Sequence, residues 1–156
     1  MTLLTSELRA ALRANDEARR AAVMAGLDEP DFAPIVKFFN PVGAATWLAT
    51  ELGEDGDTLF GLADLGFGCP ELGSFSLSEL EAVRLPLGLC IERDLHFTTR
   101  LSLAGWTAWA RRAGSIITVS QLLRRGFRAA TDEVPTPRST AEREPHKGGG
   151  RSFRGD

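Results

Sequence analysis

Side chains that build metal sites and disulfide frameworks are scarce in this sequence. Its 156 residues include two cysteines, Cys69 and Cys90, and two histidines, His96 and His146. The cysteines lack CxxC spacing, and a four-ligand zinc site would need more histidines than the chain has. Because a domain of this length buries a sufficient core without covalent staples, we expect free thiols, no cofactor and a cytoplasmic location.

Long apolar segments are also absent. No run approaches the roughly 18 residues that span a bilayer. The N-terminal stretch is interrupted by Glu7, Arg9 and Arg13, so it lacks the apolar region of a signal peptide. We therefore expect no membrane partner and a single domain over residues 1–131. Residues 132–156 are rich in proline, glycine and charge with one aromatic, which predicts a disordered tail.

Charge is divided unevenly along the chain. The net charge of −3 combines an acidic segment, residues 31–99, with a basic one, residues 100–128. The first contains eleven acidic and three basic residues, and the second contains six arginines and no acidic residue. Such a division indicates either that the two segments neutralise each other or that the basic one faces an anionic partner.

Strand composition predicts a small antiparallel sheet. It is found in four segments, at residues 35–39, 45–52, 58–65 and 89–98. The polar turn at residues 53–57 joins the second and third segments as a hairpin. Residues 66–73 form a glycine-rich loop that lacks the lysine of a phosphate-binding loop, and residues 74–75 add a short extended piece.

Capping residues predict helices on both sides of these strands. Thr5 can cap a helix that runs to about Met24 and places Leu4, Leu8 and Leu12 on the sheet, with its remaining face solvated. Three further helices follow the capping residues Ser76, Ser102 and Thr118, at residues 77–84, 102–113 and 119–131. The expected fold is α+β, with a sheet of four to five strands flanked by an N-terminal helix and two C-terminal helices.

Four blocks of sequence, taken in order, resemble a bacterial family known only as a domain of unknown function. They are KFFNPVGAATW, GDTLFGLADLGFGCPELG, SLSELEAVR and LGLCIERDLHF, and the resemblance extends from about Leu3 to Ala113. Phe75 stands where the family commonly has tyrosine, and Cys90 where it commonly has proline. The resemblance implies a setting on plasmids, integrative elements and phages, among anti-restriction and DNA-maintenance genes. It implies no catalytic residue.

The favoured function is that of a non-enzymatic accessory protein of mobile elements. It would bind a protein partner, such as a host-defence or DNA-maintenance component, through an acidic surface. The candidate binding residues on that surface are Asp55, Asp57, Glu71, Glu92, Asp94 and His96. Nothing in the sequence indicates an oligomeric state.

A metal-dependent enzyme is the first alternative. Period-two alternation in residues 89–98 would place Glu92, Asp94 and His96 on one face of a strand. Asp94 and His96 could then hold a divalent metal, with Glu71 or Asp64 as a third ligand. The competing interpretation is a solvated or helix-covered face whose carboxylates pair with the arginines of residues 100–128.

Arg93 would lie on the opposite face of that strand, with the core residues Ile91 and Phe97. A buried guanidinium requires a partner, so we expect a structural ion pair with Asp64, Glu71 or Glu79.

Nucleic-acid binding is the second alternative. Arg124 and Arg125 in the last helix could contact the phosphate backbone, and Trp106 or Trp109 could stack on bases. The competing interpretation packs both tryptophans on the sheet and pairs the arginines with its acidic residues.

Overall fold

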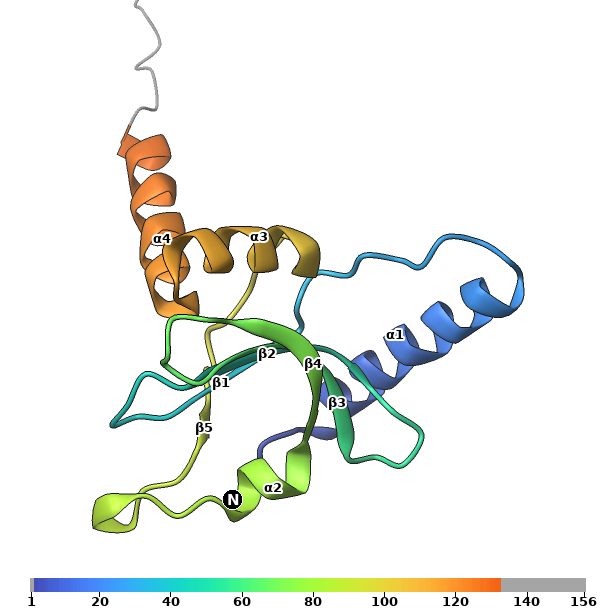
Figure 1. The fold of residues 1–156 in the computed structure, drawn as a ribbon, viewed down its shortest axis with the longest axis horizontal. Helices are drawn as coiled ribbons and strands as arrows, with labels where there is room; N and C mark the ends of the chain where they lie inside the picture. Colours follow the sequence, from blue (N-terminus) through green and yellow to red (C-terminus); the bar gives the residue numbers. More distant parts are fainter. Residues whose placement is uncertain (1, 133–156) are drawn as a thin grey trace, which may run out of the picture.

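The computed structural model describes residues 2–132, and the predicted disordered tail lies outside these residues apart from residue 132. This part has the predicted α+β fold, with one N-terminal helix, a five-stranded antiparallel sheet and two C-terminal helices (Figure 1). In chain order the elements are α1 (Ser6–Met24), β1 (Val36–Phe39), β2 (Thr46–Leu52), β3 (Thr58–Asp64), β4 (Glu71–Ser76), α2 (Leu77–Ala82), the 3-10 turn η1 (Pro86–Gly88), β5 (Glu92–Arg93), α3 (Leu103–Ala113) and α4 (Ile116–Asp132). The strand order is β4-β3-β2-β1-β5.

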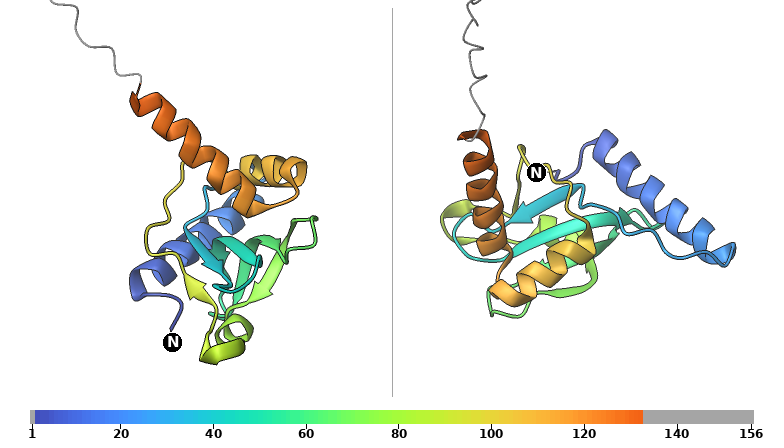
Figure 2. Two further views of the ribbon diagram at one scale, coloured as in Figure 1. Left: turned by 90° about the vertical axis from the view of Figure 1, so that its left-hand side faces the viewer. Right: turned by 90° about the horizontal axis from the view of Figure 1, so that it is seen from above.

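Each face of the sheet has its own core, because successive strand residues point to opposite faces. Leu4, Leu8 and Leu12 pack against the first core, as predicted, together with β1, β2, β3 and α2. On the other face, Leu48 and Leu62 pack against residues of α3 and α4. Figure 2 shows α3 and α4 together on one side of the sheet, with α1 on the other side.

Three of the predicted helix caps are confirmed. Thr5, Ser76 and Ser102 accept hydrogen bonds from the amides of the residues three positions later, at 3.1–3.2 Å. The predicted start of the last helix is wrong, because α4 begins at Ile116. Its first amides are bound by the Ser115 hydroxyl and by the carboxylate of Asp64, which is distant in sequence.

The fourth strand is longer than its composition predicts. Residues 71–76 pair with residues 58–63 of β3 in a continuous register, so Glu71 belongs to an edge strand and not to the glycine-rich loop. Gly73 lies opposite Gly61 in this register. Composition alone predicted an extended piece only at residues 74–75. Backbone pairing with β3 lengthens it to residues 71–76.

The last predicted strand is wrong in length. β5 contains only Glu92 and Arg93. Asp94 ends it, since its Oδ1 atom accepts a hydrogen bond from the His96 amide at 3.0 Å and its carbonyl accepts from the Phe97 amide at 3.4 Å. This turn removes the predicted alternation, so Glu92, Asp94 and His96 do not share one strand face.

Candidate functional site: a basic groove beside helix α4

Two of the predicted binding carboxylates are engaged within the chain. The Thr58 hydroxyl donates to Asp55, as do the amides of Thr58 and Asp57 at 2.9 Å, and these bonds lower the pKa of Asp55 to about 2. Asp57 accepts from the Ser76 hydroxyl and the Ser78 amide, each at 2.7 Å, and these bonds also lower its pKa. Both carboxylates therefore hold the β2–β3 turn and the start of α2 in place.

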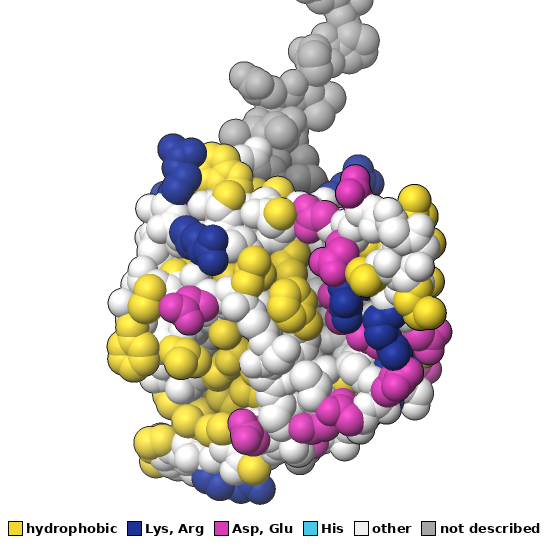
Figure 3. Space-filling view, turned by 45° about the vertical axis from the view of Figure 1, so that its right-hand side comes forward, with side chains coloured by type: hydrophobic (Ala, Val, Ile, Leu, Met, Phe, Trp, Pro, Cys, Tyr) yellow, Lys and Arg dark blue, Asp and Glu magenta, His cyan; other side chains and the backbone are white. Residues whose placement is uncertain are grey.

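Arginines of α1 neutralise the acidic residues beside this turn. Arg19 is paired with Glu51, which is 5% exposed, and Arg20 lies 2.7 Å from Glu54 and 2.9 Å from the buried Asp16. Figure 3 shows basic and acidic side chains intermingled on the right of the molecule. The prediction that the rest of α1 faces solvent holds for residues such as Ala10, Ala14 and Glu17, which are exposed. It is wrong for Asp16, Arg19 and Arg20, which contact each other and the sheet through these pairs.

Several arginines of residues 100–125 have no such partners among the described residues. In the segment 100–125, Arg100, Arg111, Arg112, Arg124 and Arg125 are exposed and have no carboxylate oxygen of residues 2–132 within 4.0 Å. Arg112 instead lies over the ring of Trp109, 5.5 Å from its centroid. Arginines of α1 thus pair with Glu51 and Glu54 of the acidic segment, whereas the five arginines named above are not paired with it.

A groove beside α4 brings several of the predicted site residues together. It has a volume of about 400 Å³, and its lining includes Lys37 of β1, Arg93 of β5, Asp94, His96 and Arg124 of α4. A smaller hollow of about 120 Å³ shares four of these residues and adds apolar and hydroxyl side chains, among them Phe97, Thr98, Thr99, Trp106, Ser120 and Leu123. The groove is therefore basic at one end and partly apolar at the other.

Lys37 is the residue at this site that sequence reasoning missed. Its side chain is 12% exposed, and its Nζ atom lies 3.8 Å from Asp94 Oδ2. Burial lowers the pKa of Lys37, the nearby positive charge of Arg124 lowers it further, and Asp94 raises it. The available signal was a lysine inside the apolar strand segment IVKFF, where the alternate positions Val36 and Phe38 face the first core.

The other predicted site residues lie elsewhere. Glu92 borders a separate hollow with Thr2 and Leu3, and Arg125 is exposed on α4. Glu71 is exposed on β4, the edge strand opposite to β5. Four strand spacings separate these two edges, which corresponds to roughly 19 Å.

The proposed metal site is not formed by the described residues. Glu71 is on the wrong edge of the sheet, and the Asp64 carboxylate binds the amides of Gly66 and Ile116. No group of three or more potential ligand side chains occurs in residues 2–132. Neither predicted third ligand can therefore join Asp94 and His96.

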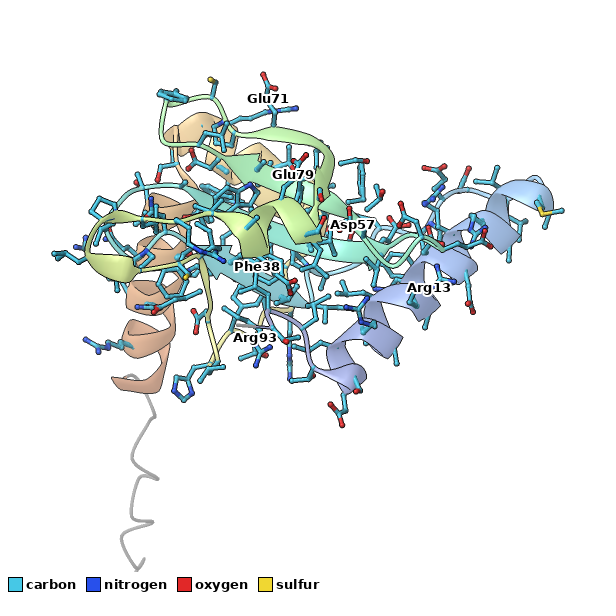
Figure 4. The ribbon with its side chains drawn as sticks, turned by 90° about the horizontal axis from the view of Figure 1, so that it is seen from below. Arg13, Phe38, Asp57, Glu71, Glu79 and Arg93 are labelled. Atoms are coloured by element: carbon cyan, nitrogen blue, oxygen red, sulfur yellow. The ribbon has the colours of Figure 1, made fainter. Side chains whose placement is uncertain are left out.

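The predicted ion pair of Arg93 is also wrong. Its Nη1 atom donates to the carbonyl oxygen of Leu3, and no carboxylate lies within salt-bridge distance of it among the described residues. Figure 4 shows Arg93 and Glu71 on opposite sides of the molecule. Because the Leu3 amide in turn donates to Glu81 at 3.0 Å, Arg93 and Glu81 hold the backbone of Leu3 between them.

Most of the residues that line the groove lie within a segment that matches a known protein family. A profile of the family described as protein of unknown function, DUF2958, matches residues 3–117. The chain belongs to this family. The DUF2958 match includes Lys37, Arg93, Asp94 and His96, whereas Arg124 lies beyond it. No curated protein and no solved structure matches the chain significantly. Among the described helices, none has the length and apolar character needed to cross a membrane.

Proposed function

We propose that this DUF2958 protein is a non-enzymatic accessory protein of mobile genetic elements that binds nucleic acid through α3, α4 and the adjoining groove. The observation that carries the proposal is that Arg111 and Arg112 of α3 and Arg124 and Arg125 of α4 are exposed and have no carboxylate of residues 2–132 within 4.0 Å. Arginines that neutralise phosphates release counterions, which supplies most of the affinity in sequence-independent binding. The setting implied by the family resemblance, among DNA-maintenance genes, agrees with such a partner.

An aromatic side chain supports the same proposal. Trp109 is 50% exposed beside Arg112, whereas Trp106 is 2% exposed and donates its indole N–H to Thr99 at 3.1 Å. A base could stack on the exposed ring, and stacking contributes about 1–3 kcal/mol per base in proteins that bind single strands. We assign the stacking role to Trp109 and a structural role to Trp106.

The acidic-surface hypothesis has less support. Asp55 and Asp57 are hydrogen-bonded within the chain, and Glu51 and Glu54 are paired with α1. An acidic surface that attracts a protein partner would need carboxylates that are free to form new pairs. Glu71 on β4 and Glu79 on α2 are exposed and form no ion pair with the described residues, which leaves two carboxylates outside the pairs above. The geometry therefore favours the basic helices as the binding surface.

Fluorescence anisotropy with labelled single-stranded and duplex DNA tests this proposal. We expect binding that weakens between about 50 and 200 mM salt, and the double substitution Arg111→Gln/Arg112→Gln should lower the slope of log K against log salt by about 2 if both contact phosphates. Arg84→Gln is the matched control, because Arg84 follows α2 and donates only to nearby backbone carbonyls. Absence of binding at low salt, or equal losses in the control, would contradict the proposal.

A further inference from the structure

We infer that the groove formed by Lys37, Arg93 and Arg124 takes up the terminal phosphate monoester of a nucleic-acid strand. The inference rests on the proposed nucleic-acid function and specifies that the groove binds the end of a strand. The three cations come from three different elements, β1, β5 and α4, and all of them line the same hollow.

The position of Lys37 distinguishes this site from the exposed arginines. Its side chain is 12% exposed, and the carboxylate nearest to it, Asp94, is 3.8 Å away. A buried cation is costly unless a counter-charge or hydrogen bonds compensate it. The positive charge of Arg124 also acts on Lys37, so two like charges face one hollow. An anion bound between them would compensate both.

The charge of the groove matches a monoester better than an internal phosphodiester. Three cations line it against the single carboxylate of Asp94, which leaves two positive charges when His96 is neutral. A phosphate monoester carries about −1.5 to −2 charges at pH 7, whereas each internal phosphate of a strand carries one. A terminal phosphate would therefore neutralise the groove almost completely.

The burial of Lys37 favours a strand end for a steric reason. An internal phosphate has the chain continuing on both sides, so it is best contacted by exposed side chains such as Arg125. The side chain of Lys37 is 12% exposed, and a terminal phosphate, with the chain on one side only, would reach it more easily. The adjoining hollow, lined in part by Phe97, Thr99 and Leu123, would then receive part of the terminal nucleotide.

The test compares oligonucleotides of one sequence that carry a 5′-phosphate, a 3′-phosphate or only hydroxyl ends. We expect the full-length protein to bind one phosphorylated form about tenfold more tightly than the hydroxyl form. Arg124→Gln should reduce that ratio to about 1, and Lys37→Met should do the same. Arg124 is exposed, so its variant is informative even if replacement of the buried Lys37 impairs folding.

Arg125→Gln is the matched control, because Arg125 is the next residue on α4 but does not line the groove. It should weaken binding of phosphorylated and hydroxyl strands equally and leave their ratio unchanged. Equal affinity of the wild type for all three strands would overturn the inference and leave the proposed function intact. Absence of binding to every strand would overturn both. Binding of a phosphoserine peptide without any strand would assign the groove to a protein ligand and contradict the inference.

Discussion

The Oδ2 atom of Asp64 accepts a hydrogen bond from the Ile116 amide at 2.9 Å. This bond joins the end of β3 to the first residue of α4, although the two residues are 52 positions apart in the chain. Asp64 is 1% exposed, and its Oδ1 atom accepts from the Gly66 amide at 2.9 Å. Because α4 carries Arg124, this buried carboxylate helps to set the position of one wall of the basic groove.

Replacement of Asp64 by alanine should destabilise the protein. The substitution leaves the Ile116 amide without its acceptor at the buried start of α4, and we expect a loss of about 2 kcal/mol in the free energy of unfolding. Urea denaturation measures this loss. Glu71→Ala serves as control, because Glu71 is exposed and its replacement should change stability by no more than about 0.5 kcal/mol. Equal stability of the two variants would show that Asp64 does not hold α4.

Asp94→Asn should increase the affinity of the groove for phosphate. The asparagine keeps an Oδ1 acceptor for the His96 amide but removes the single negative charge among the groove residues. Loss of one repulsive charge near a bound dianion should raise affinity about three- to tenfold at low salt. Calorimetric titration with inorganic phosphate measures the change. An unchanged affinity would mean that the anion does not bind near Asp94.

Asp55 should make stability depend on pH in the acid range. The hydroxyl of Thr58 and two amides lower the pKa of the folded-state carboxyl from 3.8 to about 2. Its contribution is therefore present above the unfolded-state pKa and is lost as pH falls through the folded-state pKa. Between about pH 5 and pH 2, the wild type should lose more stability than Asp55→Asn. Urea midpoints at a series of pH values test this, and parallel curves would contradict it.

Gly61 is required by the close approach of β2 and β3. A Cβ atom at this position would lie 1.7 Å from the carbonyl oxygen of Leu48. Gly61→Ala should therefore cost about 3 kcal/mol or more, because backbone in the middle of the sheet must move. Gly73→Ala is the matched control, since Gly73 lies opposite Gly61 in the sheet and a Cβ atom added there would meet no atom within 4 Å. Thermal unfolding of both variants decides the point, and similar midpoints would refute the steric argument.

Local patterns in the sequence were sufficient for most of the fold. The caps at Thr5, Ser76 and Ser102 and the hairpin of β2 and β3 depend on residues that are close together in the chain. Hydrogen bonding and turn chemistry at such short range are specified by residue type and spacing, so the α+β class was predictable. The length of β4 was not predictable in this way, because pairing with β3 extends it.

The candidate site was predicted only in part for a related reason. Asp94, His96 and Arg124 were recognised individually, but the alternation of residue types predicted that Asp94 lies inside a strand. In the structure its side chain accepts a hydrogen bond from the His96 amide, and this turn ends the strand. Lys37 joins them because β1 lies between β2 and β5, and its side chain lines a hollow together with Leu123 and Arg124 of α4.

The uneven distribution of charge was visible in the sequence, whereas the tertiary structure decided which charged residues pair with each other. Composition alone determined that residues 31–99 are acidic and residues 100–128 basic. The fold then paired Glu51 and Glu54 with arginines of α1, because α1 packs beside β2. That contact joins segments far apart in the chain, and no pattern along the sequence specifies it. Arg111, Arg112, Arg124 and Arg125 are not used in these pairs.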